Sequence, residues 1–296
     1  MYGAGGQKRV PDSFVRDYLD AVPPLDEQSA IAAFLDRETG KIDALIAEQE
    51  KLLTLLAEKR QATISHAVTR GLNPNAPMKD SGVPWLGEVP KHWSAISLKR
   101  LIAPESSISY GIVQPGEPLE DGVPFIQTTN MTNGDFSLEN LQKTSAEIAA
   151  QYPRSRLSGG EVLLGIRASI GAAHVAPTLL SGCNLSRGVA RIELDGRLMS
   201  SYLVAYFGTS AVSNYWQISK QGSTFNEVSI ETVRELSVPV PSMEDQLAIV
   251  AFVGSTKSLL DGLQGEAERG IALLKERRSA LIAAAVTGKI DVRQAA

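Results

Sequence analysis

The sequence predicts an α+β fold, in which a mixed α/β globular domain is flanked by two long helices that form an antiparallel coiled coil. Three observations support this prediction. A segment of about fifty residues occurs twice in the chain, and each copy carries apolar residues at helical spacing. Between the copies, short apolar runs alternate with turn residues, as in a domain that mixes strands and short helices.

The internal repeat begins at Val22 in the first copy and at Val240 in the second, and the offset of 218 positions is kept without a gap. The residues Gln28, Phe34, Asp43, Arg60 and Val68 recur as Gln246, Phe252, Asp261, Arg278 and Val286. Chance does not produce such agreement, so the two copies are expected to adopt the same structure.

Each copy is predicted to form one long helix. Prolines precede both copies and acidic residues follow in the expected first turn, which suits a helix start. A helix of forty-odd residues spans roughly 65 Å, which is suited to a coiled-coil spacer and too long for a helix inside a compact domain. A single apolar stripe would indicate only a core-facing helix, but two matching stripes favour pairing. The residues expected to pack helix on helix are Leu35, Ile42, Leu45, Leu52, Leu56, Leu260, Leu263, Leu274 and Leu281.

The predicted organisation has five parts. Residues 1–22 are the end of a preceding domain, because Val10 and Val15 align with Val228 and Val233 under the repeat offset. The remaining parts are a long helix at 23–72, a linker at 73–80, the mixed α/β domain at 81–240 and a second long helix at 241–296. Within the domain we expect strands at 125–128, 161–166 and 189–194 and a helix at 200–207.

The composition indicates a cytoplasmic protein. Cys183 is the only cysteine, which excludes an internal disulfide, and no apolar run reaches the roughly 18 residues of a membrane span. The formal net charge of −4 argues mildly against a chain that holds DNA alone. Between Lys143 and Lys220, however, the sequence contains eight basic residues and only four acidic ones.

No catalytic constellation is present in the sequence. The motif Asn73-Pro74-Asn75 lacks the aromatic residues of an adenine methyltransferase loop, and the glycines at 3, 5 and 6 do not open a strand-turn-helix unit. The three histidines lie far apart, so no metal site is predicted. We therefore expect a chain that is not an enzyme by itself.

Several segments point to a family. The opening of the domain, Asp80 to Trp93, is followed in order by Tyr110–Gly116, Gly160–Arg167, Leu185–Ala190 and Gly222–Asn226. These segments, together with the repeat, resemble the DNA specificity subunits of type I restriction-modification systems, although the second repeat copy departs at Pro241–Gln246. Members of that family usually have two target-recognition domains, whereas this chain has one complete domain. The resemblance therefore implies a truncated or half specificity subunit, with 1–22 as the remnant of the first domain.

The resemblance implies a function and a set of partners. The domain at 81–240 would read one half-site of double-stranded DNA, and the helices would dock methyltransferase subunits and restriction (translocase) subunits. The cofactors S-adenosylmethionine, ATP and Mg²⁺ would belong to those partners, with none bound to this chain. The resemblance does not decide whether two copies of the chain pair as a homodimer. The alternatives are a stand-alone methyltransferase or nuclease, and a structural coiled-coil interaction protein without DNA specificity.

Candidate DNA contacts follow from side-chain chemistry, because arginine forks onto guanine and asparagine or glutamine onto adenine. The candidates for base readout are Gln127, Thr128, Asn130, Arg167 and Arg187. The candidates for phosphate contact are Arg154, Arg156, Lys220 and Thr224. An ordinary polar loop at 127–130 and paired core arginines at 167 and 187 remain the alternatives.

Overall fold

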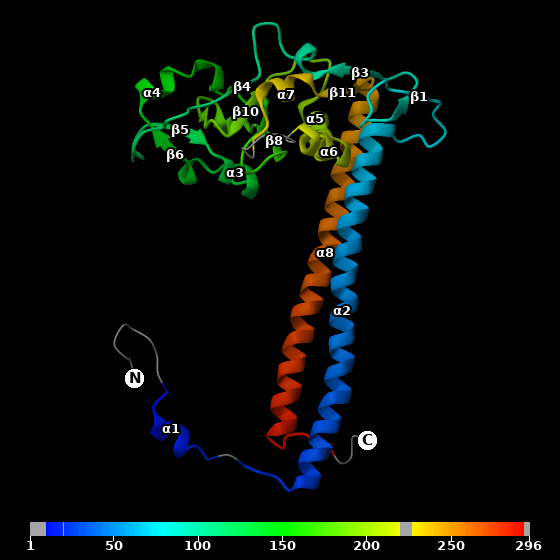
Figure 1. Ribbon diagram of the computed structural model, residues 1–296, viewed down its shortest axis with the longest axis vertical. Coiled ribbons are helices and arrows are strands. Elements are labelled where there is room, and N and C mark those ends of the chain that lie inside the picture. The colour runs from blue at the N-terminus through cyan, green and yellow to red at the C-terminus, as the bar shows by residue number, and fades with distance from the viewer. Residues whose placement is uncertain (1–9, 20, 220–226, 293–296) are drawn as a thin grey trace. The chain divides into compact units, whose positions relative to one another are not determined.

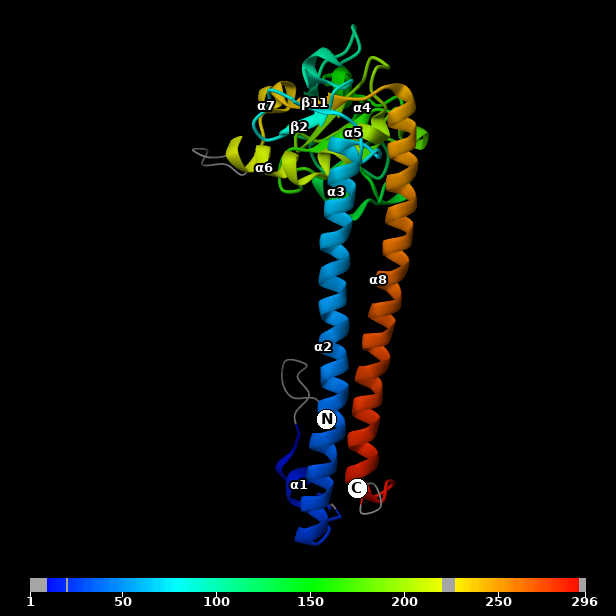
Figure 2. The ribbon, with the colours of Figure 1, turned by 90° about the vertical axis from the view of Figure 1, so that its right-hand side faces the viewer.

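The computed structural model describes residues 10–19, 21–219 and 227–292 and falls into two compact units. The first unit comprises Met1–Leu56 and Gly262–Ala296, and the second comprises Ala57–Asp261. The long helices α2 (Leu25–Arg70) and α8 (Met243–Val286) each contribute to both units, and within each unit they lie side by side (Figure 1 and Figure 2). Helix α1 (Asp12–Arg16) belongs to the first unit.

The two helices pair in antiparallel fashion, as the sequence predicts. In the first unit, the Arg278 guanidinium donates to the Asp43 carboxylate at 2.8 Å. In the second unit, Arg60 forms the corresponding ion pair with Asp261. Asp43 and Asp261 occupy one position of the repeat and the two arginines occupy another, so each copy gives its aspartate to the arginine of the other. Antiparallel pairing of two copies of one repeat produces this exchange.

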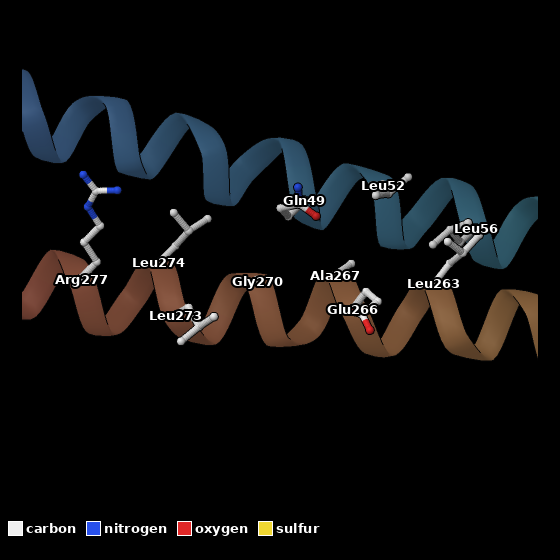
Figure 3. A pocket seen from close by; sticks show the side chains of 10 residues that line it. All are labelled: Gln49, Leu52, Leu56, Leu263, Glu266, Ala267, Gly270, Leu273, Leu274 and Arg277. Carbon is white, nitrogen blue, oxygen red and sulfur yellow. The ribbon is translucent and has the colours of Figure 1, made fainter.

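The seam between the helices is only partly closed. Ile42 and Leu260 are buried, and Leu35, Leu56, Leu274 and Leu281 are half-buried. Leu45, Leu52 and Leu263 are exposed, although Leu52 and Leu263 still line the space between the two helices. Gly270 of α8 lines this region, and a Cβ added there would meet nothing within 4 Å. A groove of about 510 Å³ therefore opens between the helices of the first unit (Figure 3).

The mixed α/β domain starts and ends on a pair of strands. Strand β3 (Ser94–Ser97) pairs with β11 (Ser237–Val240), so the two ends of the domain lie together beside the start of α8. Strand β1 (Met78–Asp80) pairs with β2 (Glu88–Pro90). The predicted linker at 73–80 therefore ends in a strand.

Two sheets form the body of the domain. The first has the antiparallel order β4 (Ser109–Tyr110), β10 (Val189–Ile192), β7 (Val162–Gly165) and β8 (Ala173–Val175). The second has the order β6 (Gln142–Thr144), β5 (Val123–Ile126) and β9 (Asn184–Leu185), with β5 and β9 parallel. Strands β5, β7 and β10 lie where the sequence predicts strands, apart from one or two residues at their ends.

Short helices connect and cover these sheets. They are α3 (Thr128–Asn133), α4 (Ala146–Ala150), α5 (Ser200–Phe207), α6 (Ser210–Ser219) and α7 (Ile230–Glu235). Short 3₁₀ turns lie at Leu98–Arg100, Leu138–Asn140, Pro153–Ser155 and Thr178–Leu180. Helix α5 spans the predicted residues, and its Tyr202 and Tyr206 are fully buried in the main core with Trp93.

Side-chain hydrogen bonds fasten the domain to the helices within the second unit. The Tyr202 hydroxyl donates to the Val68 carbonyl at the end of α2, at 2.7 Å. The buried Gln246 of α8 accepts the Met199 N–H at 2.7 Å and donates to the Arg197 carbonyl at 3.0 Å. Both helices are therefore bonded directly to the segment around α5.

Asp245 adds a second fastening at the start of α8. Its carboxylate accepts hydrogen bonds from Trp93 Nε1 at 3.1 Å and interacts with His92 Nε2 at 2.9 Å. Partial burial acts to raise the pKa of the Asp245 carboxyl, but its hydrogen bonds with His92, Trp93 and Ser242 together lower it. The carboxylate therefore stays charged and ties the start of the domain to the helix.

Candidate nucleic-acid interface

Loop segments from four parts of the domain meet where β5, β7 and β9 end. The Ser186 N–H donates to the Ile126 carbonyl at 2.8 Å, which joins the end of β9 to the end of β5. The Ile166 N–H donates to the Gly188 carbonyl at 2.9 Å, and the Ile112 N–H donates to the Leu185 carbonyl at 2.6 Å. Three segments that are far apart in the sequence and carry the family resemblance are thus bonded to one another.

At Gly188 these loops approach one another closely. A Cβ added at Gly188 would lie 2.4 Å from Thr128 Cγ2 and 3.6 Å from the Cβ of Arg167. Real Cβ atoms essentially never approach another atom as closely as 2.4 Å, so glycine is needed here for Thr128 to lie over the backbone, with Arg167 in ordinary contact beside it. The structure therefore brings together Thr128, Arg167 and the neighbouring Arg187, three of the five predicted readout residues.

Arg187 has a fixed backbone and an exposed side chain. Its N–H donates to the Ile112 carbonyl at 2.9 Å. Among the residues that the structure describes, none forms a hydrogen bond or ion pair with its guanidinium. An exposed arginine held at its base in this way can offer its donors to an external acceptor.

Arg167 is instead half-buried and paired within the protein. Its guanidinium forms an ion pair with Glu227, the first described residue after the segment 220–226. Its Nε is buried and has no hydrogen-bond partner within the described part of the chain. The alternative of a paired arginine therefore applies to Arg167, and Glu227 is a site residue that sequence reasoning missed. Its position directly after the Gly222–Asn226 segment was the available signal.

Gln127 and Asn130 stabilise the start of α3. The sequence suggests that they end a strand with free polar groups, but the strand ends at Ile126 and a helix begins at Thr128. The Gln127 N–H donates to Asn130 Oδ1 at 2.9 Å, and Gln127 Nε2 donates to Gln142 Oε1 at 3.1 Å. Asn130 therefore has a structural role at the helix start, and capping by the residue at the third helical position was the signal that was overlooked.

Arg154 and Arg156 form a separate basic group at the turn Pro153–Ser155. Both side chains are exposed. The turn is held by Asn184, whose buried amide donates to the Tyr152 carbonyl and the Ser155 hydroxyl, each at 3.1 Å. This anchored pair of cations suits phosphate contact, whereas the predicted phosphate residues Lys220 and Thr224 lie outside the described residues.

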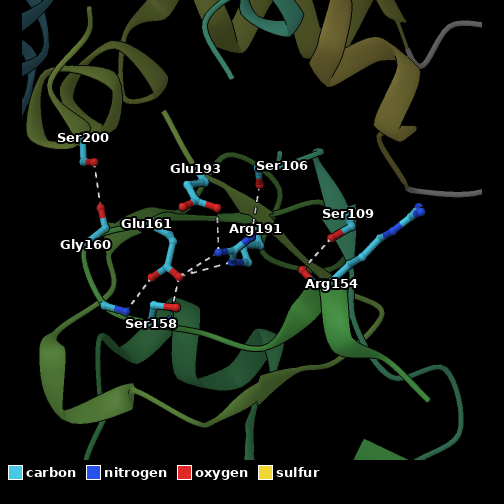
Figure 4. A network of polar contacts seen from close by, with 10 residues as sticks. Ser106, Ser109, Arg154, Ser158, Gly160, Glu161, Arg191, Glu193 and Ser200 are labelled. Carbon is cyan, nitrogen blue, oxygen red and sulfur yellow. Dashed lines mark hydrogen bonds and ion pairs between the residues drawn. The ribbon is translucent and has the colours of Figure 1, made fainter. Parts of the chain in front are cut away.

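Arg191, another basic residue of this stretch, belongs to the interior (Figure 4). Its guanidinium donates to the buried Glu161 carboxylate at 3.1 and 3.2 Å and to Glu193 at 2.8 Å. Glu161 also accepts the N–H groups of Ser158 and Gly159 at 2.7 and 2.8 Å. Burial acts to raise the pKa of the Glu161 carboxyl, but these N–H groups and Arg191 together lower it. Arg191 is therefore engaged in packing the domain.

The described residues contain no group of three or more His, Cys, Asp and Glu side chains placed to hold a metal ion. No helix among them has the length and apolar character needed to cross a membrane.

Comparison with known proteins identifies a family for the domain. Residues 116–264, half of the chain, match the family model described as Type I restriction modification DNA specificity domain. The chain is 26% identical over 291 residues to the type I restriction enzyme EcoBI specificity subunit of Escherichia coli, covering 97% of this chain and 61% of that protein. It is 24% identical over 295 residues to the putative type I restriction enzyme MjaX specificity subunit of Methanocaldococcus jannaschii, covering 98% and 63%. The chain thus spans about three fifths of the length of these relatives.

Solved structures share the fold. The HsdS subunit from Thermoanaerobacter tengcongensis matches with a TM-score of 0.56 and 21% identity, covering 98% of this chain and 65% of that chain. A chain from a structure of complex assembly and conformational transition of the type I R-M system matches with a TM-score of 0.67 and 21% identity, covering 90% and 60%. The mixed α+β domain with paired long helices is therefore an established architecture.

Proposed function

Because the chain belongs to the family of type I restriction modification DNA specificity domains, we propose that it is the non-catalytic DNA-reading part of a type I restriction-modification complex. The domain at 81–240 reads one half-site of double-stranded DNA. The observation that carries this proposal is the convergence of the resembling loop segments around Gly188, beside the exposed Arg187. We call Gln127, Thr128, Arg167 and Arg187 the readout cluster.

The members of the readout cluster take different roles. Arg187 has the exposed guanidinium that can fork onto O6 and N7 of guanine. Arg167 carries the same group, but Glu227 has to release it or direct it before it can reach a base. Thr128 can contact a base edge or a thymine methyl group, and the Gln127 amide would exchange its bond with Gln142 for one with adenine.

Backbone contact is assigned to Arg154 and Arg156, with Lys220 and Thr224 as further candidates. Two or four such contacts on a chain of net charge −4 give weak binding at physiological salt. Partner subunits would therefore supply much of the grip on phosphates.

The helices are proposed to dock methyltransferase subunits and, through them, restriction subunits. The lining of the groove of the first unit includes Leu52, Leu56, Leu263, Leu273 and Leu274 (Figure 3), and Leu45 and Leu55 of α2 are exposed as well. Exposed leucines along a helix pair fit an apolar helix face of a partner. We assign S-adenosylmethionine, ATP and Mg²⁺ to those partner subunits, with none held by this chain.

The first repeat copy provides a place for a second recognition domain. In the second unit, Val233 and Leu236 are fully buried against the domain, whereas their equivalents Val15 and Tyr18 are 69% and 63% exposed. Gln28 makes the same bond to Pro23 that its equivalent makes to Pro241, but no described residue provides the domain contacts made by Gln246.

A second copy of the chain is one source of that domain, and we propose a homodimer on this basis. Light scattering of the full chain tests it, with a mass of twice 31.7 kDa expected. A single-chain mass at all concentrations would rule the homodimer out.

The DNA-reading proposal is tested by binding in the complex reconstituted with its methyltransferase subunits, after the preferred sequence has been found by mapping methylated adenines. Arg187→Ala should weaken binding to the preferred sequence by about 1–3 kcal/mol, with little effect on unrelated DNA. Arg154→Ala should weaken binding to all sequences alike and reduce the salt slope by about one.

Arg269→Ala is the matched control, because Arg269 is an exposed arginine of α8 that forms an ion pair with Glu266 of the same helix. It should leave both the preference and the salt slope unchanged. A preference for the target that survives alanine at all four positions of the readout cluster would refute the assigned roles. A complex without any sequence preference would support the structural coiled-coil alternative instead.

A further inference from the structure

An open apolar groove lies beside the end of α2 in the second unit. It has a volume of about 600 Å³, and its lining includes Thr63, Ala67, Leu72 and Phe252. We call it the Phe252 groove. Phe252 itself is 37% exposed, although it is a large aromatic residue facing the helix pair.

The repeat shows how the corresponding groove of the first unit is filled. The equivalents of the four lining residues are Leu281, Ala285, Ile290 and Phe34, and these four pack in one apolar cluster. Val292 completes that cluster and is only 7% exposed. As a result Phe34 is 8% exposed, although its counterpart Phe252 is not covered.

The chain directions after the two helices explain the difference. After α8, the N–H groups of Lys289 and Ile290 both donate to the Ala284 carbonyl, at 2.9 and 3.3 Å, which turns the chain back over the helix pair. After α2, the residue equivalent to Val292 is Pro74, which is exposed.

A local turn at Asn73 fixes the path of the chain after α2. The Asn75 N–H donates to Asn73 Oδ1 at 2.9 Å, and the Ala76 N–H donates to the Asn73 carbonyl at 3.2 Å. The chain therefore leaves towards β1: Leu72 lines the Phe252 groove, but Pro74 does not take the place over Phe252 that Val292 takes over Phe34.

We propose that the Phe252 groove docks a segment of a partner subunit that presents a β-branched aliphatic side chain to Phe252, as Val292 does in the equivalent groove. The segment comes from another polypeptide, because this chain's own tail is already buried on Phe34. The proposal deepens the docking of partner subunits and rests on it, but it does not depend on DNA reading.

A labelled synthetic peptide with the sequence of residues 287–292 tests the chemistry of the groove. In fluorescence anisotropy with the full chain, we expect saturable binding that Phe252→Asp weakens at least tenfold. A peptide with Val292→Asp should lose binding to the same extent. Phe252 is partly exposed, so its replacement should preserve folding, which circular dichroism checks.

Leu259→Asp is the matched control, since Leu259 is an exposed leucine on the same helix and in the same unit. It should bind the peptide like the unchanged chain. Absence of saturable binding, or equal weakening by Phe252→Asp and Leu259→Asp, would overturn the docking site.

Assembly with the methyltransferase subunits tests the source of the segment. Phe252→Asp should lower the affinity of the complex at least tenfold relative to Leu259→Asp, whereas the DNA sequence preference of the complex that still forms should not change. Peptide binding together with unchanged assembly would refute a partner-subunit segment. Loss of DNA preference in readout variants that still bind the peptide would concern the DNA-reading proposal alone.

Discussion

Replacing Gln246 with alanine should destabilise the second unit far more than the equivalent replacement of Gln28. The side chain of Gln246 is fully buried and makes three hydrogen bonds, to the Met199 N–H and to the carbonyls of Arg197 and Pro241. A hydrogen bond contributes about 1 kcal/mol net, and a buried donor left unpaired costs about 1–3 kcal/mol. We therefore expect Gln246→Ala to lower the free energy of unfolding by about 3–4 kcal/mol.

Gln28 is the internal control for this prediction. It occupies the same repeat position and makes one exposed bond to the Pro23 carbonyl at 2.8 Å. Water replaces such a bond readily, so Gln28→Ala should cost about 0.5 kcal/mol or less. The contrast between two chemically identical changes isolates the contribution of the domain contacts.

Tryptophan fluorescence in urea measures the second unit selectively, because Trp85, Trp93 and Trp216 are the three tryptophans and all belong to it. With a slope of about 2–3 kcal/mol per molar urea, Gln246→Ala should lower the unfolding midpoint by about 1–2 M. Equal midpoints for Gln246→Ala and Gln28→Ala would show that the Gln246 bonds do not fasten the domain to α8.

Three further outcomes follow from the structure. The lowered pKa of Glu161 means that its stabilising effect is present at neutral pH and lost as the pH falls below the ordinary value of 4.5. Glu161→Gln should therefore lower the free energy of unfolding by about 3 kcal/mol at pH 7, because it leaves Arg191 without its main partner. The variant should also lose less stability than the unchanged chain as the pH falls below 4.5. An equal loss of stability in acid would contradict this reasoning. In Gly188→Val the new side chain would collide with Thr128, which should lower the free energy of urea unfolding by about 1–3 kcal/mol and reduce the DNA sequence preference. Unchanged stability and unchanged preference would argue against the close approach. Leu56→Asp should lower helicity by circular dichroism and cost about 2–4 kcal/mol, and unchanged helicity and melting would argue against helix pairing through this residue.

Much of the architecture is predictable from the sequence because it depends on periodic or repeated patterns. The repeat predicts two equivalent helices, and the exchanged pairs Asp43–Arg278 and Arg60–Asp261 are what its antiparallel alignment requires. Helix α5 and the central strands follow from local apolar patterns in the same way. These features follow from local spacing of apolar residues and from comparison of the two repeat copies.

The partners of individual polar side chains depend on distant parts of the chain. Arg167, Arg187 and Arg191 look alike in the sequence as arginines in small or apolar surroundings. The fold gives Arg167 the carboxylate of Glu227 and Arg191 the buried carboxylate of Glu161, and leaves Arg187 exposed. No local pattern distinguishes them, because each partner is brought close by strand pairing or by a loop crossing.

The sequence alone therefore determined the fold class, the paired helices and the family of this protein, since amphipathic spacing, repetition and motif order are properties of the chain. Tertiary structure decided which arginine is exposed, which leucines stay exposed and which of two equivalent grooves is filled. The grooves show why. Phe34 and Phe252 occupy the same repeat position, but only the chain that follows α8 bends back to place Val292 on its phenylalanine, because burial is set by the path of the surrounding chain.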